Sequence, residues 1–230
     1  MYEMVVRNFE READLLATLS HPSIPRIYDY FTADSSSYLI MEFIEGRDLE
    51  AVLRETTEPI AEAQVVAWAI ELCDVLTYLH SHQPQPVVFR DVKPSNIMIE
   101  GKTGRAYLAD FGLAILWQAA GSGDKIAGTP AYMSPEQARG DAGIDPRSDI
   151  FSLGTVLYEL LAGCRPFAAQ SPAEVLRQIV QDEPSNLSQV EPPVPEALAR
   201  ICTKALSKSP ADRYQSAEEL SADLAAWLAR

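Results

Sequence analysis

Two short motifs near the middle of the chain bring together side chains that can do chemistry. The first, FRDVKPSN, contains Asp91, Lys93 and Asn96, and the second, DFG, begins at Asp110. Carboxylate and amide oxygens are ligands for a hard cation such as Mg²⁺, and an ammonium group can neutralise a phosphate. These are the demands of phosphoryl transfer, which also requires the attacking hydroxyl to be held in line. Taken alone, each of these residues is more simply interpreted as a solvated polar group of a loop.

The two motifs belong to an ordered series that resembles the protein kinase family, and within it the serine/threonine branch. GTPAYMSPE follows at residues 128–136, then DIFSLG from Asp149, and finally a late arginine, Arg213. A lone DFG would mean little, whereas the complete series in this order and spacing is specific. The resemblance covers essentially the whole chain, which is similar to the eukaryotic-type (Hanks-type) kinases of bacteria.

The resemblance implies ATP and Mg²⁺ as cofactors and a protein bearing Ser or Thr hydroxyls as the substrate. Asp91 is then expected to orient the substrate hydroxyl and accept its proton, and Lys93 to stabilise the transferred phosphate. Asn96 and Asp110 are expected to bind Mg²⁺. Gly112 is expected to let the backbone turn sharply beside the Asp110 carboxylate.

The resemblance also implies a binding site for ATP at the junction of two lobes. Glu42 and Ile44 match the hinge, whose backbone is expected to hydrogen-bond adenine, and Met98 is expected to pack beneath the adenine ring. Glu12 matches the glutamate that pairs, in this family, with an ATP-binding lysine. All four residues are therefore candidate cofactor-binding residues.

Regulation is expected to act through the segment that follows DFG. Arg90 can receive a phosphate group carried by that segment. Ser122 is the one hydroxyl residue between DFG and Gly128, although its Gly-Ser-Gly setting is equally typical of a flexible linker. Phe89 stands where the family usually has histidine, and we expect its ring to fill an apolar column together with Phe111.

Four further residues are expected to hold the catalytic segments in place. By resemblance, Glu136 and Arg213 form a buried ion pair that ties the activation segment to the helical lobe. Asp149 is expected to hold the backbone of the FRDVKPSN segment (residues 89–96), which we call the catalytic loop. Thr129 is expected to link that loop to the peptide-binding segment. Removing one partner of a buried ion pair typically costs about 3–5 kcal/mol.

Hydrophobic periodicity and turn residues predict the elements that position these groups. A helix is predicted over residues 8–19, followed by two extended runs near residues 26–31 and 38–43. The polar stretch between the runs indicates a hairpin. Helical patterns then begin at Asp48 and continue, after a break, over about residues 60–81.

The second half of the chain is predicted to be mainly helical. Short strands and tight turns are expected across residues 87–108, and nearly continuous helix from Asp149 onward. Ser171 and Ser216 each precede a glutamate by three residues, which is the pattern of a capping box at the start of a helix.

These elements predict an α+β, protein-kinase-like fold of two lobes. Residues 1–44 would form a partial small lobe, with one helix and two strands, and residues 45–230 a complete, mainly helical large lobe. The eleven residues before Glu12 contain neither glycine nor lysine, and the first lysine is Lys93. The glycine-rich loop and ATP-binding lysine of the family are thus missing from this sequence. We expect little or no kinase activity from the chain alone, and self-association through its incomplete small lobe.

Three functions compete for this sequence. A Ser/Thr protein kinase is favoured because Asp91, Lys93, Asn96 and Asp110 are all present. A pseudokinase that acts as a scaffold explains the short small lobe but not the presence of these four residues. A small-molecule phosphotransferase is disfavoured by the GTPAYMSPE segment, which is typical of kinases with peptide substrates.

The composition of the chain limits the classes of binding partner that we expect. A net charge of −14 argues against nucleic acid or an anionic membrane as the main partner. No uninterrupted apolar run is long enough to span a membrane, so we expect a soluble protein of the cytoplasm. The spacing of Cys73, Cys164 and Cys202 indicates neither a disulfide framework nor a zinc site. Asp48 and nearby acidic residues would suit basic peptides, but an acidic helix start explains them as well.

Overall fold

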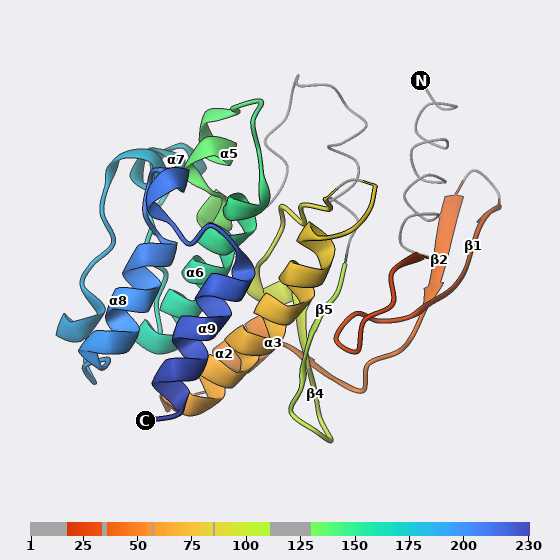
Figure 1. Ribbon diagram of the computed structural model, residues 1–230, viewed down its shortest axis with the longest axis horizontal. Helices are drawn as coiled ribbons and strands as arrows, with labels where there is room; N and C mark the ends of the chain where they lie inside the picture. The colour runs from red at the N-terminus through yellow and green to blue at the C-terminus, as the bar shows by residue number, and fades with distance from the viewer. Residues whose placement is uncertain (1–17, 34–35, 57, 85, 111–129) are drawn as a thin grey trace.

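A small antiparallel hairpin lies to one side of a larger, mainly helical body (Figure 1). The structure is a computed structural model, and it describes residues 18–33, 36–56, 58–84, 86–110 and 130–230. The helix predicted over residues 8–19 therefore lies almost wholly outside the described residues.

The hairpin consists of strands β1 (Ile27–Ala33) and β2 (Ser36–Met41), which pair antiparallel. Both strands were predicted, but β2 starts within the expected serine turn, because Ser36 and Ser37 join the ladder opposite Ala33 and Thr32. The connection is therefore shorter than the pattern of polar residues suggests.

A second, three-stranded antiparallel sheet has the order β3-β4-β5. Its strands are β3 (Gly46–Asp48), β4 (Ile97–Glu100) and β5 (Ala106–Leu108). The pairing of β3 with β4 joins the segment after the hairpin to the segment after the catalytic loop. Strand β3 was not predicted, since three residues are too few to show an alternating pattern.

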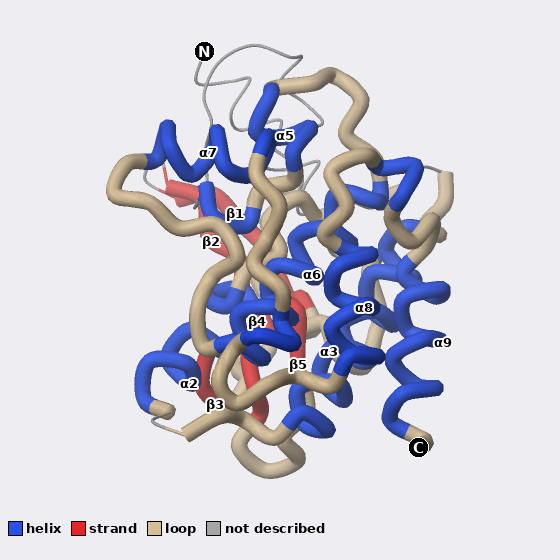
Figure 2. Tube along the Cα trace, turned by 90° about the vertical axis from the view of Figure 1, so that its left-hand side faces the viewer, coloured by secondary structure: helices blue, strands red, loops and turns tan. Residues whose placement is uncertain are grey.

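Two long helices form the centre of the helical body. Helix α3 (Glu62–His80) packs against α6 (Pro146–Ala162) and α9 (Ala217–Leu228), and α8 (Glu196–Ala205) packs against both α6 and α9. Figure 2 shows the body from the side, with α3, α6, α8 and α9 together. Of the 17 residues of α6, 13 are buried, so this helix forms the core and not a surface layer.

Shorter helices complete the body around this core. The remaining α-helices of the described residues are α2 (Leu49–Glu55), α5 (Pro135–Arg139) and α7 (Pro172–Gln181). The 3₁₀-helices are η1 (Pro94–Asn96), η2 (Pro130–Tyr132), η3 (Leu187–Gln189) and η4 (Pro210–Asp212). In the part of the chain that the structure describes, no helix is long and apolar enough to cross a membrane.

The predicted capping boxes of α7 and α9 form only in part. Each serine does accept a hydrogen bond from the expected amide, Ser171 from Glu174 N and Ser216 from Glu219 N. The Glu174 carboxylate, however, pairs with Arg177, and the Glu219 carboxylate accepts from the amide of the residue before Ser216. Neither glutamate carboxylate therefore accepts from the serine amide, as a complete capping box requires. Glu174 binds Arg177 instead, and Glu219 binds the amide of the residue before the serine.

Two of the three cysteines belong to the hydrophobic core. Cys73 and Cys202 are fully buried, and burial raises the pKa of both thiols. Cys164 is exposed. All three thiols are free.

Candidate active site

The catalytic loop holds Asp91, Lys93 and Asn96 in direct contact. Lys93 Nζ donates to Asp91 Oδ2 at 2.8 Å, and Asn96 Nδ2 donates to the same oxygen at 2.9 Å and to the Asp91 carbonyl at 2.9 Å. The Asp91 and Lys93 side chains are only 14% and 15% exposed. Short range and partial burial strengthen these charged contacts, so the carboxylate is held in one orientation.

The backbone before Asp91 is fixed by a buried carboxylate from α6. Asp149 accepts from Phe89 N at 2.8 Å and Arg90 N at 2.6 Å, and His80 Nε2 lies 2.8 Å from Asp149 Oδ2. Arg90 has a φ of +67°, a conformation that costs free energy in a residue other than glycine. Asp149 thus fixes the two peptide amides that lead into this conformation.

His80 is a residue that sequence reasoning missed. It occupies the last turn of α3, and 69 residues separate it from Asp149. No local pattern links a histidine at the end of one helix to an aspartate in another. Its side chain is only 10% exposed and occupies the Asp149 oxygen that also receives Phe89 N.

Strand pairing brings Asp110 to Asn96. Ile97 of β4 lies opposite Leu108 of β5, and Ala109 N donates to Asn96 O at 2.8 Å. Asp110 follows at the exposed end of this ladder, with a φ of +58°. The two candidate metal ligands therefore come from adjacent chain segments.

The donor set at this position fits Mg²⁺. Asn96 uses its amide nitrogen on Asp91, and its Oδ1 accepts no hydrogen bond from any described residue, so one oxygen is open for a cation. The described residues contain no cluster of three or more His, Cys, Asp or Glu that could hold a metal. One carboxylate and one amide suit Mg²⁺, which takes few protein ligands and completes its shell with water and phosphate.

The hinge residues lie between the hairpin and the helical body. Glu42 N donates to Arg26 O at 2.7 Å, and the Glu42 carboxylate accepts from Arg26 N at 3.1 Å. Ile44 is buried, and Met98 is half-buried on β4. Within the described ranges, no hydrogen bond uses the Glu42 carbonyl or the Ile44 amide, so both remain available to a ligand.

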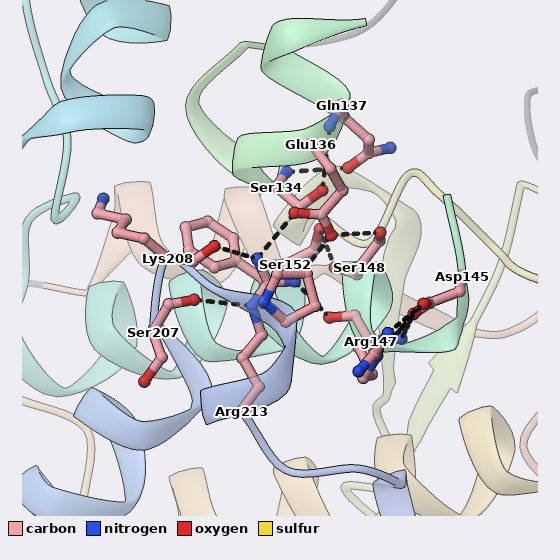
Figure 3. A network of polar contacts seen from close by, with 12 residues as sticks. Ser134, Glu136, Gln137, Asp145, Arg147, Ser148, Ser152, Ser207, Lys208 and Arg213 are labelled. Carbon is pink, nitrogen blue, oxygen red and sulfur yellow. Dashed lines mark hydrogen bonds and ion pairs between the residues drawn. The ribbon is translucent and has the colours of Figure 1, made fainter. Parts of the chain in front are cut away.

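Glu136 and Arg213 form the buried ion pair that the resemblance implied (Figure 3). Arg213 Nη1 and Nη2 donate to the two Glu136 oxygens at 2.7 and 2.8 Å, and Ser148 Oγ donates to Oε1 at 2.6 Å. The guanidinium also donates to the backbone carbonyls of Arg147, Ser207 and Lys208. Burial by itself raises the pKa of Glu136, but the hydrogen bonds from Arg213 and Ser148 outweigh it and lower the pKa to about 2.

Helix α5 reaches the catalytic loop through Gln137, a second residue that sequence reasoning missed. Ser134 Oγ accepts from Gln137 N and the Gln137 Oε1 accepts from Ser134 N, which completes a capping box. The remaining amide group of Gln137, Nε2, donates to Arg90 O at 2.9 Å. The spacing of Ser134 and Gln137 was a signal for the cap, but not for the contact with Arg90.

Several predicted site residues lie outside the described residues. These are Glu12, Phe111, Gly112, Ser122 and Thr129. The assignments made for them from the sequence remain predictions. Phe89, the expected neighbour of Phe111, lies fully buried in the core.

Comparison with known proteins decides the family. The protein kinase domain matches this chain over residues 2–224. The chain belongs to the protein kinase family. This membership and the α+β fold predicted for it are therefore confirmed.

Curated relatives place the chain near bacterial serine/threonine kinases. It is similar to the serine/threonine-protein kinase PknB of Mycobacterium leprae (40% identity over 223 residues) and of Mycolicibacterium smegmatis (39% over 224). PknB of Mycobacterium tuberculosis is 38% identical over 226 residues. Each match covers 94% of this chain and 35% of the relative, so the chain spans about a third of their length.

Proposed function

We propose that this chain carries the transfer site of an ATP- and Mg²⁺-dependent kinase that phosphorylates Ser and Thr hydroxyls of proteins. The observation that carries the proposal is the geometry of Asp91, whose carboxylate contacts both Lys93 and Asn96 on a backbone fixed by Asp149. The names of the relatives, serine/threonine-protein kinases, support the same substrate class.

Asp91 would act on the substrate hydroxyl. Lys93 and Asn96 both bind Oδ2, and Oδ1 accepts no hydrogen bond from a described residue. The open oxygen can orient the hydroxyl and take its proton. Lys93 Nζ, 2.8 Å from the other oxygen, is close enough to stabilise negative charge on the group being transferred.

Asn96 and Asp110 would hold Mg²⁺, and the hinge would hold adenine. When bound, Mg²⁺ neutralises charge on the phosphates. The unused Glu42 carbonyl and Ile44 amide offer one acceptor and one donor to the edge of adenine. Met98, half-buried on β4 opposite Asp48, offers an apolar surface beneath the ring.

Substitution of the two aspartates tests this proposal. Phosphate transfer from labelled ATP to a Ser/Thr-containing protein should be measured for the chain alone and for the chain joined to a glycine-rich loop and lysine strand from a related kinase. Asp91→Asn and Asp110→Ala should each lower the rate by about 100-fold or more. Asp141→Asn, at an exposed surface ion pair, is the control and should have little effect.

The outcomes separate the two assignments. Undiminished activity of Asp110→Ala would reject the metal assignment, and undiminished activity of Asp91→Asn would reject its role with the hydroxyl. Transfer that is absent from both proteins, although ATP binds, would favour the scaffold function.

A further inference from the structure

A groove of about 490 Å³ opens beside the catalytic loop. It is lined by α2 and the loop after it, by Pro94 and Tyr132, and by Glu159 and Arg165 at the carboxyl end of α6 and beyond. Pro94 is three residues from Asp91, a separation of at most about 11 Å along the chain. A protein segment bound in this groove would therefore lie next to the candidate transfer site.

The lining of the groove is more acidic than basic. Its described carboxylates and guanidinium groups belong to Glu50, Glu58, Glu159, Glu191, Arg54 and Arg165. On a chain of net charge −14, such a lining would steer basic protein segments toward the site. Whether each carboxylate is open to a substrate cation depends on the hydrogen bonds that it already makes.

Glu159 is already occupied. Tyr132 OH donates to its Oε2 at 2.6 Å, and Arg165 Nε donates to its Oε1 at 3.1 Å. Arg165 Nε also donates to the Tyr132 oxygen at 3.2 Å, and its guanidinium lies 5.3 Å from the centroid of the Tyr132 ring. The Glu159 side chain is only 12% exposed. Both of its oxygens therefore have partners from this chain.

We propose that Arg165 is a specificity-determining residue that occupies Glu159 and so excludes a basic substrate side chain from this part of the groove. The proposal rests on the proposed function, since it concerns the protein substrate of the same site. A substrate guanidinium would have to share the Glu159 oxygens with the donors that Tyr132 and Arg165 already place on them. It would also lie beside a second positive charge. Selection against one class of partner through such a repulsive element is a general route to specificity.

The test compares peptide binding by variants that change the charge of the groove in different places. The protein is titrated into fluorescent Ser-containing peptides in which one arginine is moved through each position around the serine, with glutamine as the matched peptide. Arg165→Gln opens Glu159, and Arg54→Gln removes an equal charge from the same groove without touching Glu159. The double variant Arg165→Gln/Glu159→Gln removes the carboxylate as well, and thermal unfolding checks that each variant is folded.

We expect Arg165→Gln to gain a preference for arginine of about 10-fold at one peptide position. The double variant should lose that preference, and Arg54→Gln should not gain it. If Arg165 only stabilises the end of α6, the folded Arg165→Gln variant will show the same order of peptide affinities as the wild type. That result would overturn the proposal.

Glu159→Gln keeps the proposal testable should Arg165→Gln fail to fold. A masked Glu159 predicts that this variant keeps the wild-type order of peptides, whereas loss of an existing arginine preference would show an open carboxylate and overturn the proposal. If no folded variant bound any of the peptides, the proposal that the groove is a substrate site would be overturned. The readout needs no catalysis. Preferences that change as expected, when phosphate transfer is absent even from the chain joined to a glycine-rich loop and lysine strand, would therefore reject only the proposed function.

Discussion

In Asp91 and Asn96 of the candidate site, some polar side-chain atoms make hydrogen bonds within the chain while others remain available to a ligand. Lys93 and Asn96 fill one oxygen of Asp91, and Asn96 spends its amide nitrogen so that its oxygen remains available. Such hydrogen bonds fix the orientation of a side chain but leave its reactive oxygen without a partner among the described residues. The free energy needed to organise the site when substrate binds is therefore smaller. Glu159 differs because each of its two oxygens already accepts a hydrogen bond from this chain.

Glu136 gives a prediction about pH. Glu136→Gln should lower the free energy of unfolding at pH 7 by about 3–5 kcal/mol, because the buried Arg213 guanidinium loses its counter-charge. Since folding lowers the pKa of Glu136 from 4.5 to about 2, this contribution is present above pH 4.5 and is lost as the pH falls toward 2. Urea unfolding of both proteins from pH 7 to pH 3 should show the difference between them narrowing below pH 4.5.

The control for this prediction is Glu174→Gln. Glu174 pairs with Arg177 at the surface, and exposed pairs of this kind contribute little to stability. A difference between wild type and Glu136→Gln that stays constant down to pH 3 would contradict the linkage.

At the scale of elements, α6 and α8 pack closely because small residues meet between them. A Cβ added to Gly154 would lie 2.9 Å from the Cβ of Ala205, which is closer than two carbon atoms can approach without a shift. Cys202 Sγ also donates to Gly154 O at 3.5 Å. The spacing of the two helices is thus set at Gly154.

Gly154→Val should destabilise the protein by about 2 kcal/mol through overpacking of this contact. Ala222→Val is the matched control. It introduces valine at an exposed position of α9, where the added side chain is not packed between two helices. Thermal and urea unfolding should show a clear loss for the first variant and a small change for the second. Equal losses in the two variants would mean that valine acts through helix propensity and not through packing.

Patterns in the sequence predicted the helices and strands more successfully than they predicted the contacts between distant residues. The hairpin and the long helices could be predicted because each carries its own periodicity. Strand β3 could not, since it is specified by its pairing with β4. The Glu136 partner was predicted only through resemblance, because 77 residues separate it from Arg213, and the contacts of His80 and Gln137 have no local signature at all.

At the scale of the whole molecule, apolar surface gathers at the hairpin. Large side chains exposed there and just beyond it are Tyr28, Phe31, Tyr38, Ile40, Met41 and Phe43, of which Phe43 is 87% exposed. The Phe31 and Tyr38 rings stack across the strands at 5.1 Å. Exposed apolar side chains that gather in one region favour association, and we propose a second copy of the chain as the partner.

Substituting one exposed ring tests that proposal. Sedimentation velocity over a range of concentrations should show self-association of the wild type, and Phe43→Ser should shift it to higher concentration. Leu228→Ser, which removes an exposed apolar side chain at the far end of α9, should leave it unchanged. A wild-type protein that stays monomeric at every concentration would contradict the proposal.

The burial of α6 has a consequence for how the molecule opens. A helix with 13 of its 17 residues buried has almost no solvated face from which its amides could be reached by local fraying. Its amides should exchange with deuterium only when the whole helical body unfolds, while surface helices such as α2 exchange through smaller openings. Because Asp149 sits in that helix, the anchor of the catalytic loop belongs to the last part of the protein to come apart.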